Sequence, residues 1–310
     1  MYSCHSESPT SPPPATQPAV KPIATPVFNA DSAYAFVKAQ VDFGPRIPGT
    51  PAHQACADYL SKQLTLFGFN VGTQKGTVQT YDQKKFTLKN IIASYKPDLQ
   101  SRILICAHWD TRPWADEDRV NPQLPFDGAN DGASGVGVAL EIARQIQTLP
   151  PNIGVDILFF DLEDYGDADG EGESSWCLGS QYWSNNLHTP NYSANFGILL
   201  DMVGNANAVF PKEEQSMSFA SNAVDKVWKT AADIGYGNFF SSQRLAFVGS
   251  DDHVYVNKAG IPCLDIITYD PKSGGFGDFH HTHEDNMSVI DKSTLKAVGQ
   301  TVLEVIYKEK

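Results

Sequence analysis

Two histidines and five carboxylates occur along this chain in short segments that could together bind a metal ion. They are His108, Asp131, Glu163, Asp164, Asp201, Asp251 and His281. Imidazole and carboxylate groups suit zinc, and a catalytic zinc uses three protein ligands and keeps one position open. Clustered carboxylates repel one another, so a cation, shared protons or hydrogen bonds must offset that repulsion. A metal ion is the simplest explanation, and the absence of a His-Glu-x-x-His motif excludes a helical zincin.

The elements that must position these residues alternate between strands and helices from residue 31 onward. Strands are expected at 86–94, 102–107, 155–161, 196–202 and 262–267, with helices near 132–148, 217–234 and 291–308. Asp31 is expected to cap an earlier helix that ends at Gly44, and Pro51 to open another that Gly68 ends. This repetition predicts a single α/β domain, with a central mixed, mostly parallel, twisted sheet and helices on both faces.

Acidic or histidine residues follow most of the predicted strands. They occur in Ala107–Asp110, Asp161–Asp164, Leu200–Met202 and Thr268–Asp270, the last of which leads to His280 and His281. An aspartate at a single strand end often begins a turn or caps a helix. Sheets of this kind, however, bind ligands beyond the carboxyl ends of their strands. Four such ends together therefore favour one shared site.

The order of these segments carries a resemblance to a known family. AHWD, GANDGASG, FFDLED, LLD, SDDH and HHTHED resemble the zinc-dependent aminopeptidase family that also contains the animal-type glutaminyl cyclases, over about residues 28–310. For the aminopeptidases, the resemblance implies two zinc ions, with ligands at His108, Asp131, Asp164, Asp201 and His281. Asp131 would then bridge the two ions, and Glu163 would be the general base.

For the cyclases, the same resemblance implies one zinc ion, with ligands at Asp131, Asp164 and His281. The acid-base and hydrogen-bonding groups would then be Glu163, Asp201 and Asp251, and His108 would mark the position that a second metal would use. Because every position of the dinuclear pattern is occupied, the ligands alone do not separate the two branches.

The segment around residue 251 distinguishes the branches better. Asp251 and Asp252 before His253 resemble the doubled aspartate of the cyclases, whereas the peptidases usually have a single aspartate there. We therefore predict a glutaminyl-peptide cyclotransferase with one zinc ion per chain. It would convert the N-terminal glutamine of peptides and proteins to pyroglutamate and release ammonia. The alternative is a dinuclear zinc aminopeptidase.

The substrate pocket is expected to involve aromatic residues of a long loop. Trp109, Trp114 and Phe126 lie between residues 107 and 129, and long ordered loops in compact domains are often lids. These three residues are expected to line the pocket together with His280, which stands where the animal cyclases have tryptophan. Surface packing is the alternative for the aromatic residues. His53 is expected at the surface.

Apart from Glu163 and Asp164, the acids of segment 161–173 have two possible interpretations. It carries seven acids in thirteen residues and lacks the spacing of an EF-hand. A solvated acidic loop is favoured, and calcium binding is the alternative.

Composition limits the partners of the chain. Its 310 residues include 23 Lys+Arg and 36 Asp+Glu, for a net charge of −13, so nucleic acid is not expected as a ligand. No apolar run approaches the 18 or more residues of a spanning helix. The five cysteines form no Cys-x-x-Cys pair and leave the redox compartment open. A monomer is expected.

The N-terminal part differs in composition from the rest. Residues 1–26 are rich in Ser, Thr and Pro and predict a disordered tether, which leaves 27–310 as the catalytic domain. A cysteine at position 4 before such a stretch resembles a mature bacterial lipoprotein, and a lipid on Cys4 would be the only membrane contact. We therefore expect an extracytoplasmic protein, either periplasmic, attached to the outer membrane or secreted.

Overall fold

The computed structural model describes residues 1, 24–170, 172–244, 248–270 and 274–310. Cys4 and most of the predicted tether lie outside the described residues, so the expectations for the tether stay predictions. Residues 24–29 run along the last helix, where Gln300 Nε2 donates to Pro26 O at 3.1 Å and Phe28 N donates to Gln300 Oε1 at 2.9 Å.

The described residues alternate between strands and helices, as expected. The helices are α1 Ala30–Val41, α2 Pro51–Leu66, α3 Ala133–Thr148, α4 Leu178–Asn185, α5 Glu214–Asp233, α6 Asp252–Lys258 and α7 Lys292–Lys308, with a 3-10 turn at Glu173–Ser175. The strands are β1 Asn70–Gln79, β2 Lys85–Tyr95, β3 Arg102–His108, β4 Gly154–Phe160, β5 Phe196–Asp201, β6 Phe210–Lys212, β7 Phe240–Arg244 and β8 Cys263–Ile267. Among the helices of the described ranges, none is long and apolar enough to cross a membrane.

Six strands form the central sheet in the order β1-β2-β4-β3-β5-β8. The strands β4, β3, β5 and β8 are parallel, while β1 and β2 are antiparallel to each other and β2 is antiparallel to β4. The parallel strands are buried along their whole length, as expected for strands covered on both faces. This is the single α/β domain that the sequence predicts.

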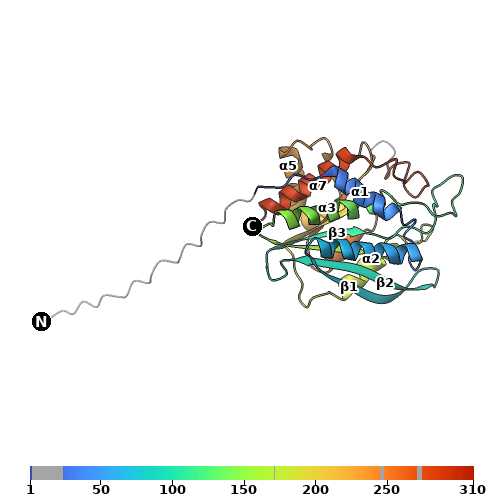
Figure 1. Ribbon diagram of the computed structural model, residues 1–310, viewed down its shortest axis with the longest axis horizontal. Coiled ribbons are helices and arrows are strands. Elements are labelled where there is room, and N and C mark those ends of the chain that lie inside the picture. The colour runs from blue at the N-terminus through green and yellow to red at the C-terminus, as the bar shows by residue number, and fades with distance from the viewer. Residues whose placement is uncertain (2–23, 171, 245–247, 271–273) are drawn as a thin grey trace.

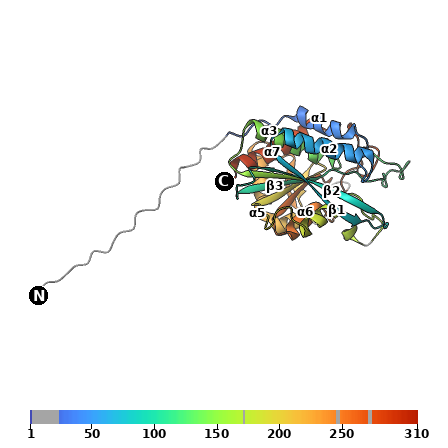
Figure 2. The ribbon, with the colours of Figure 1, turned by 60° about the horizontal axis from the view of Figure 1, so that its bottom comes forward.

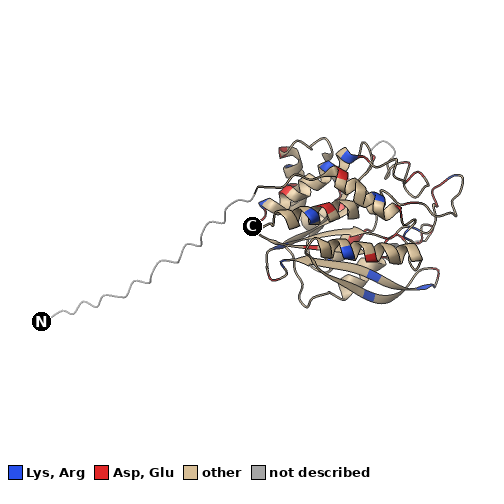
Figure 3. Cartoon of the chain, in the orientation of Figure 1, with Lys and Arg blue, Asp and Glu red and all other residues tan. Residues whose placement is uncertain are grey.

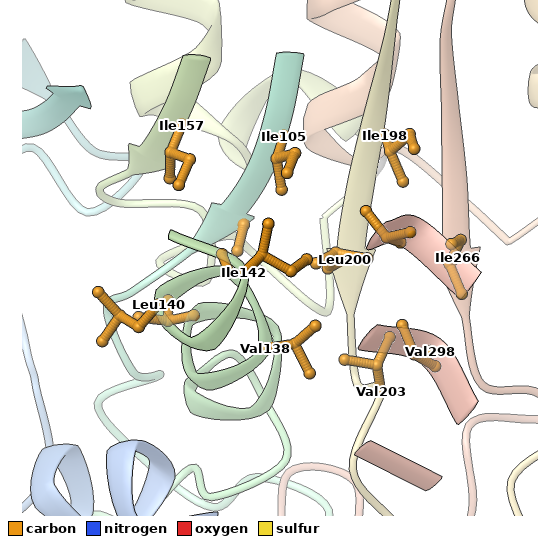
Figure 4. Close-up of a cluster of buried hydrophobic side chains, with 14 of the residues drawn as sticks. Ile105, Val138, Leu140, Ile142, Ile157, Ile198, Leu200, Val203, Ile266 and Val298 are labelled. Carbon is orange, nitrogen blue, oxygen red and sulfur yellow. The ribbon is translucent and has the colours of Figure 1, made fainter. Parts of the chain in front are cut away.

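Helices cover both faces of this sheet. Figure 2 shows α1, α2, α3 and α7 on one side of the strands and α6 on the other. Figure 1 shows α1, α3 and α7 side by side in front of the sheet. Between the layers, isoleucines of β3, β4, β5 and β8 face α3 and α7 (Figure 4). A smaller apolar cluster on the opposite face joins the sheet to α4 and α6.

The structure differs from the sequence expectations at several elements. Asn29, rather than Asp31, caps α1, and it accepts a hydrogen bond from Ser32 N. The strand β1 was not expected because it is a largely exposed edge strand with polar residues at most positions, so it has no apolar run. The short helices α4 and α6 were also missed, because each is at most eight residues long and shows little periodicity.

Candidate active site

The parallel strands bring the predicted site residues to one edge of the sheet. His108 is the last residue of β3 and Asp201 the last residue of β5, while Glu163 and Asp164 follow β4. Asp251 is the N-cap of α6. A cleft of about 720 Å³ lies at this edge. Six of the seven predicted metal-binding and catalytic residues line it, namely Asp131, Glu163, Asp164, Asp201, Asp251 and His281.

Two of the groups that could hold a metal consist entirely of predicted ligand positions, and the first of these is Asp131, Asp164 and His281. One ligand atom from each residue lies within 4.8 Å of the others, and all three residues are buried. His281 Nε2 is 3.2 Å from Asp164 Oδ1 and 3.6 Å from Asp131 Oδ2. Two carboxylates and one imidazole, buried and converging in this way, fit the three protein ligands of a catalytic zinc.

The second group consists of His108, Asp131 and Asp201, and its ligand atoms also lie within 4.8 Å of one another. His108 Nε2 is 2.8 Å from Asp131 Oδ1 and 3.4 Å from Asp201 Oδ1. The two oxygens of Asp131 therefore face different histidines. Asp131 could therefore bridge two metal ions, as the dinuclear pattern requires.

Nearby carboxylates raise the pKa of both histidines. Burial alone would lower the pKa of His108, but its contacts with Asp110, Asp131 and Asp201 raise that pKa well above its ordinary value. For His281, burial again acts downward, and the neighbouring carboxylates of Asp164 and Asp116 raise the pKa to about 10. The surrounding carboxylates thus favour the protonated form of both imidazoles when no metal is bound.

Glu163 is held by its backbone and lies in a low-dielectric environment. The carboxylate of Asp110 accepts hydrogen bonds from Glu163 N at 3.1 Å and Asp164 N at 3.3 Å. Burial is the main cause of a pKa well above the ordinary value for Glu163, with His108 opposing it and Asp164 and Asp251 adding to it. A carboxyl group whose pKa is raised in this way is suited to general acid-base catalysis.

A group of buried acids lies beside Glu163. Burial and the charge of Asp201 raise the pKa of Asp251 to about 6. Asp252 and Asp265 are fully buried, and burial raises the pKa of each well above its ordinary value. Asp265 lies within 4.8 Å of Asp251, measured between potential ligand atoms. A proton held by Asp265 can therefore be shared with Asp251.

The loop that carries Asp131 is fixed by Asp285. The carboxylate of Asp285 accepts hydrogen bonds from Asn130 N at 2.7 Å and Asp131 N at 3.1 Å. Gly132 follows, and a Cβ at that position would lie 2.3 Å from His108 Nε2. The glycine thus permits the close contact between this loop and His108.

Arg112 and Asp116 support the ligands of the first group from the outside. Arg112 is almost fully buried, and its guanidinium binds both oxygens of Asp116. Asp116 Oδ1 in turn lies 3.3 Å from His281 Nδ1. Arg112 N also donates to Asp164 Oδ2 at 3.1 Å. One pair of residues therefore contacts two of the three groups that fit zinc.

The aromatic residues that were expected in the pocket have other surroundings. Trp109 is fully buried, stacks on His53 at 4.2 Å between ring centroids, and donates to Lys89 O. Trp114 packs against Tyr165, and the buried Phe126 lies 6.1 Å from the His281 ring. Among the described residues, none of these three lines the cleft. Trp109 and Phe126 are buried and Trp114 is half-buried, so these rings pack into the body of the protein and not into the cleft.

Other side chains form the wall of the cleft. His280 lines it as expected, joined by Trp176 and Phe276, which sequence reasoning missed. His280 stacks on His281 with ring centroids 3.8 Å apart. Residues 167–170 of the acidic segment also line the cleft.

His53 was expected at the surface but is 1% exposed. Its Nε2 lies 2.8 Å from Asp161 Oδ1, and Asp161 Oδ2 accepts a hydrogen bond from Lys89 N at 2.7 Å. This buried pair anchors the start of the segment that leads to Glu163. His53 lies in α2, and the helical periodicity of the sequence alone could not show which polar residue of this helix faces the sheet.

Sequence reasoning also missed several supporting residues. Of these, only Asp265 left a clear signal, since it is a lone acid in the apolar strand β8. Arg112, Asp116 and Cys177 gave none, because they lie in loops whose path depends on the whole fold.

Comparisons with known proteins agree with this geometry. A model of peptidase family M28 matches residues 90–306. The structure is similar to that of Bacteroides thetaiotaomicron glutaminyl cyclase bound to N-acetylhistamine, with 53% identity and a TM-score of 0.90 over 93% of this chain and 100% of that one. It is also similar to a Zn-dependent exopeptidase from Parabacteroides distasonis ATCC 8503, with 51% identity and a TM-score of 0.89 over 92% of this chain and 100% of that one.

More distant curated relatives fall in both branches. The aminopeptidase YwaD of Bacillus subtilis (strain 168) is 28% identical over 232 residues, which are 72% of this chain and 45% of that protein. The glutaminyl-peptide cyclotransferase of Bothrops jararaca is 26% identical over 297 residues, which are 85% of this chain and 77% of that protein. The chain thus spans less than half of the Bacillus aminopeptidase and about three quarters of the Bothrops cyclotransferase.

Proposed function

Because the chain belongs to peptidase family M28, with solved relatives on both sides of the cyclase and exopeptidase division, we propose that it is a glutaminyl-peptide cyclotransferase. It converts the N-terminal glutamine of peptides and proteins to pyroglutamate and releases ammonia. The observation that carries this proposal is the match with the Bacteroides cyclase at 53% identity over 93% of the chain. The pair of buried acids Asp251 and Asp252, typical of the cyclase pattern, supports it at the site.

Zinc is the metal that the family and the ligand set imply, and Asp131, Asp164 and His281 would hold it. A zinc ion bound there supplies Lewis-acid chemistry at the γ-carbonyl of the substrate. We propose one ion per chain. The doubled aspartate Asp251 and Asp252, which resembles the cyclase pattern, supports this number.

Glu163 carries out the proton transfers. The α-amine of the substrate attacks its own γ-amide, so the nucleophile is already tethered and proximity lowers the barrier. Glu163 takes a proton from the attacking nitrogen and returns it to the departing nitrogen, which leaves as ammonia. A lactam C–N bond forms and the amide C–N bond breaks, with no net change in protons on the enzyme.

Asp251 orients the amide that is cleaved. A carboxylate oxygen of Asp251 and one of Glu163 lie within 4.8 Å of each other, so both can reach the same small group. Asp251 Oδ2 is buried and makes no hydrogen bond to the described residues. Asp251 also lines the cleft, so its carboxylate can accept a hydrogen bond from the amide nitrogen, while Asp201 and Asp265 supply the shared proton that limits repulsion.

A dinuclear zinc aminopeptidase is the second candidate function. The observation that favours it is the converging group of His108, Asp131 and Asp201, which keeps a second metal position. The similarity to the Bacillus aminopeptidase points the same way. In that function His108 and Asp201 would hold a second zinc ion together with Asp131.

One assay separates the two functions. Purified protein is incubated with a Gln-peptide and with a Leu-peptide of otherwise identical sequence, and ammonia and free amino acid are both measured. The proposal expects ammonia and a pyroglutamyl peptide from the first and nothing from the second. Release of free leucine without ammonia would contradict the cyclase proposal. Metal analysis of the same sample is expected to find one zinc per chain, and two would support the peptidase.

A further inference from the structure

Cys177 is a buried thiol that contacts the proposed base, although the reaction described above does not use it. Its side chain is fully buried, and its Sγ lies 3.2 Å from Glu163 Oε1. A second acceptor, Ser250 O, is farther away at 3.8 Å. The shorter contact joins the thiol to a carboxylate, which is the stronger acceptor of the two.

The backbone delivers this side chain to Glu163. Cys177 N donates to Glu163 O at 2.9 Å, and Leu178 N donates to Leu162 O at 2.9 Å. Cys177 itself has a φ of +58°, in the left-handed region that non-glycine residues rarely adopt. Two backbone hydrogen bonds thus pin the start of α4 to the segment that carries the base.

The contact has a defined direction. Burial, reinforced by the charges of Glu163, Asp252 and Asp251, raises the pKa of the Cys177 thiol well above its ordinary value. The sulfur therefore keeps its proton, and the S–H group donates to Glu163 Oε1. The other oxygen, Oε2, lies on the side of His108, 4.0 Å from His108 Nδ1.

We propose that Cys177 is a positioning residue for Glu163, whose S–H···Oε1 hydrogen bond fixes the carboxylate and leaves Oε2 to exchange the proton. This inference rests on the proposed role of Glu163 in cyclisation. A freely rotating carboxylate would spend less time in the orientation that proton transfer needs, so loss of the bond should lower kcat. Zinc content should stay unchanged, because Cys177 is not one of the proposed zinc ligands Asp131, Asp164 and His281. KM should stay unchanged, because the described cleft lining does not include Cys177.

The test compares Cys177→Ala, which removes the donor, with Cys177→Ser, which keeps a hydroxyl donor at the same place. Cys56→Ala is the matched control, since Cys56 is also fully buried but lies in α2. Steady-state kinetics with a Gln-peptide, zinc content and thermal midpoint are measured for all variants. We expect kcat to fall about tenfold in Cys177→Ala and to recover most of that loss in Cys177→Ser.

Two kinetic outcomes would overturn the proposal. The first is a kcat for Cys177→Ala equal to that of the unmodified protein and of Cys56→Ala. The second is an equal loss in the alanine and serine variants, which would show that the size of the side chain matters and its donor does not. If Cys177→Ala does not fold, a serine variant with unmodified kcat supports the donor role and one with a lowered kcat contradicts it. Failure of the cyclase proposal is separate, because the unmodified protein would then release no ammonia.

Discussion

At the scale of single residues, Glu163 and Asp164 are chain neighbours with different tasks. Asp164 Oδ1 faces His281 at 3.2 Å, whereas Glu163 lies against Cys177 and near Asp251. Both of their backbone N–H groups donate to Asp110. This shared anchor lets one residue serve as a ligand while the next remains free to carry a proton.

Replacing the proposed base should separate catalysis from metal binding. In Glu163→Gln the side chain keeps its size but can no longer take up a proton, so kcat for a Gln-peptide should fall by about 10²–10⁴-fold. Zinc content should be unchanged, because Asp131, Asp164 and His281 remain. Glu214→Gln, at an exposed position in the first turn of α5, is the control and should behave like the unmodified protein. Full activity in Glu163→Gln would remove this residue from the mechanism.

The carboxylate behind His281 should affect zinc affinity. Asp116 Oδ1 lies 3.3 Å from His281 Nδ1, and such partners orient the imidazole and raise its basicity. Asp116→Asn removes the charge and should weaken zinc binding by about 10–100-fold, as measured by competition with a chelator. Asp118→Asn is the control in the same loop. Asp118 pairs with His283 and not with His281, so this variant should bind zinc with unchanged affinity. Equal affinities in the two variants would show that Asp116 does not support the ligand.

At the scale of elements, the site depends on how closely α3 approaches the sheet. A Cβ on Gly135 would lie 2.0 Å from the backbone oxygen of Leu200, the residue before Asp201 in β5. The helix α3 follows directly on the loop that carries Asp131. The lack of a side chain at this glycine therefore sets the spacing between two of the segments that form the site.

Enlarging that contact should destabilise the protein. In Gly135→Ala the new methyl group meets backbone on the side of β5, so we expect the free energy of unfolding to fall by about 1–3 kcal/mol. Urea unfolding measures the change. Gly72→Ala in β1 is the control, because no heavy atom lies within 4 Å of a Cβ there and no loss is expected. Unchanged stability in Gly135→Ala would mean that α3 can move away from the sheet at little cost.

At the scale of the whole molecule, the net charge of −13 has an inner and an outer part. Figure 3 shows acidic and basic residues mixed on the outer helices, where solvent screens them. In contrast, Asp131, Asp164, Asp201, Asp251, Asp252 and Asp265 are buried near one another. The free-energy cost of placing these carboxylates close together therefore depends on how many are protonated, on the nearby histidines and on bound metal.

Without zinc, stability should therefore fall as the pH rises from 5 to 8. The pKa values of Asp251 and Asp285 are raised to about 6 and about 8. The folded protein thus keeps protons that the unfolded chain has lost, and the free energy of unfolding decreases as pH increases through this range. His281 acts in the same direction, since burial lowers its pKa but the nearby carboxylates raise it from 6.5 to about 10. His188 opposes the trend, because its partial burial lowers its pKa.

Urea unfolding of chelator-treated protein at pH 5, 6.5 and 8 checks this expectation, with zinc-loaded protein as the comparison. Zinc should stabilise the protein more at pH 8 than at pH 5, because the ligands must lose their protons to bind it. Higher stability at pH 8 than at pH 5 in the chelated protein would contradict the expected proton balance.

The sequence by itself determined the α/β class, the parallel strands and the segments whose acids and histidines converge, because apolar runs and the residues that follow them are local features. Their convergence could be expected since the carboxyl ends of parallel strands meet at one edge of a sheet. The His-Thr-x-x-Asp spacing also indicated a loop-fixing role for Asp285, which its hydrogen bonds to the loop of Asp131 agree with. Only the tertiary structure decided that Trp109 and His53 are buried and that Cys177 contacts Glu163. Such contacts join separate segments, 108 positions apart for His53 and Asp161, and no local pattern encodes which segments will touch.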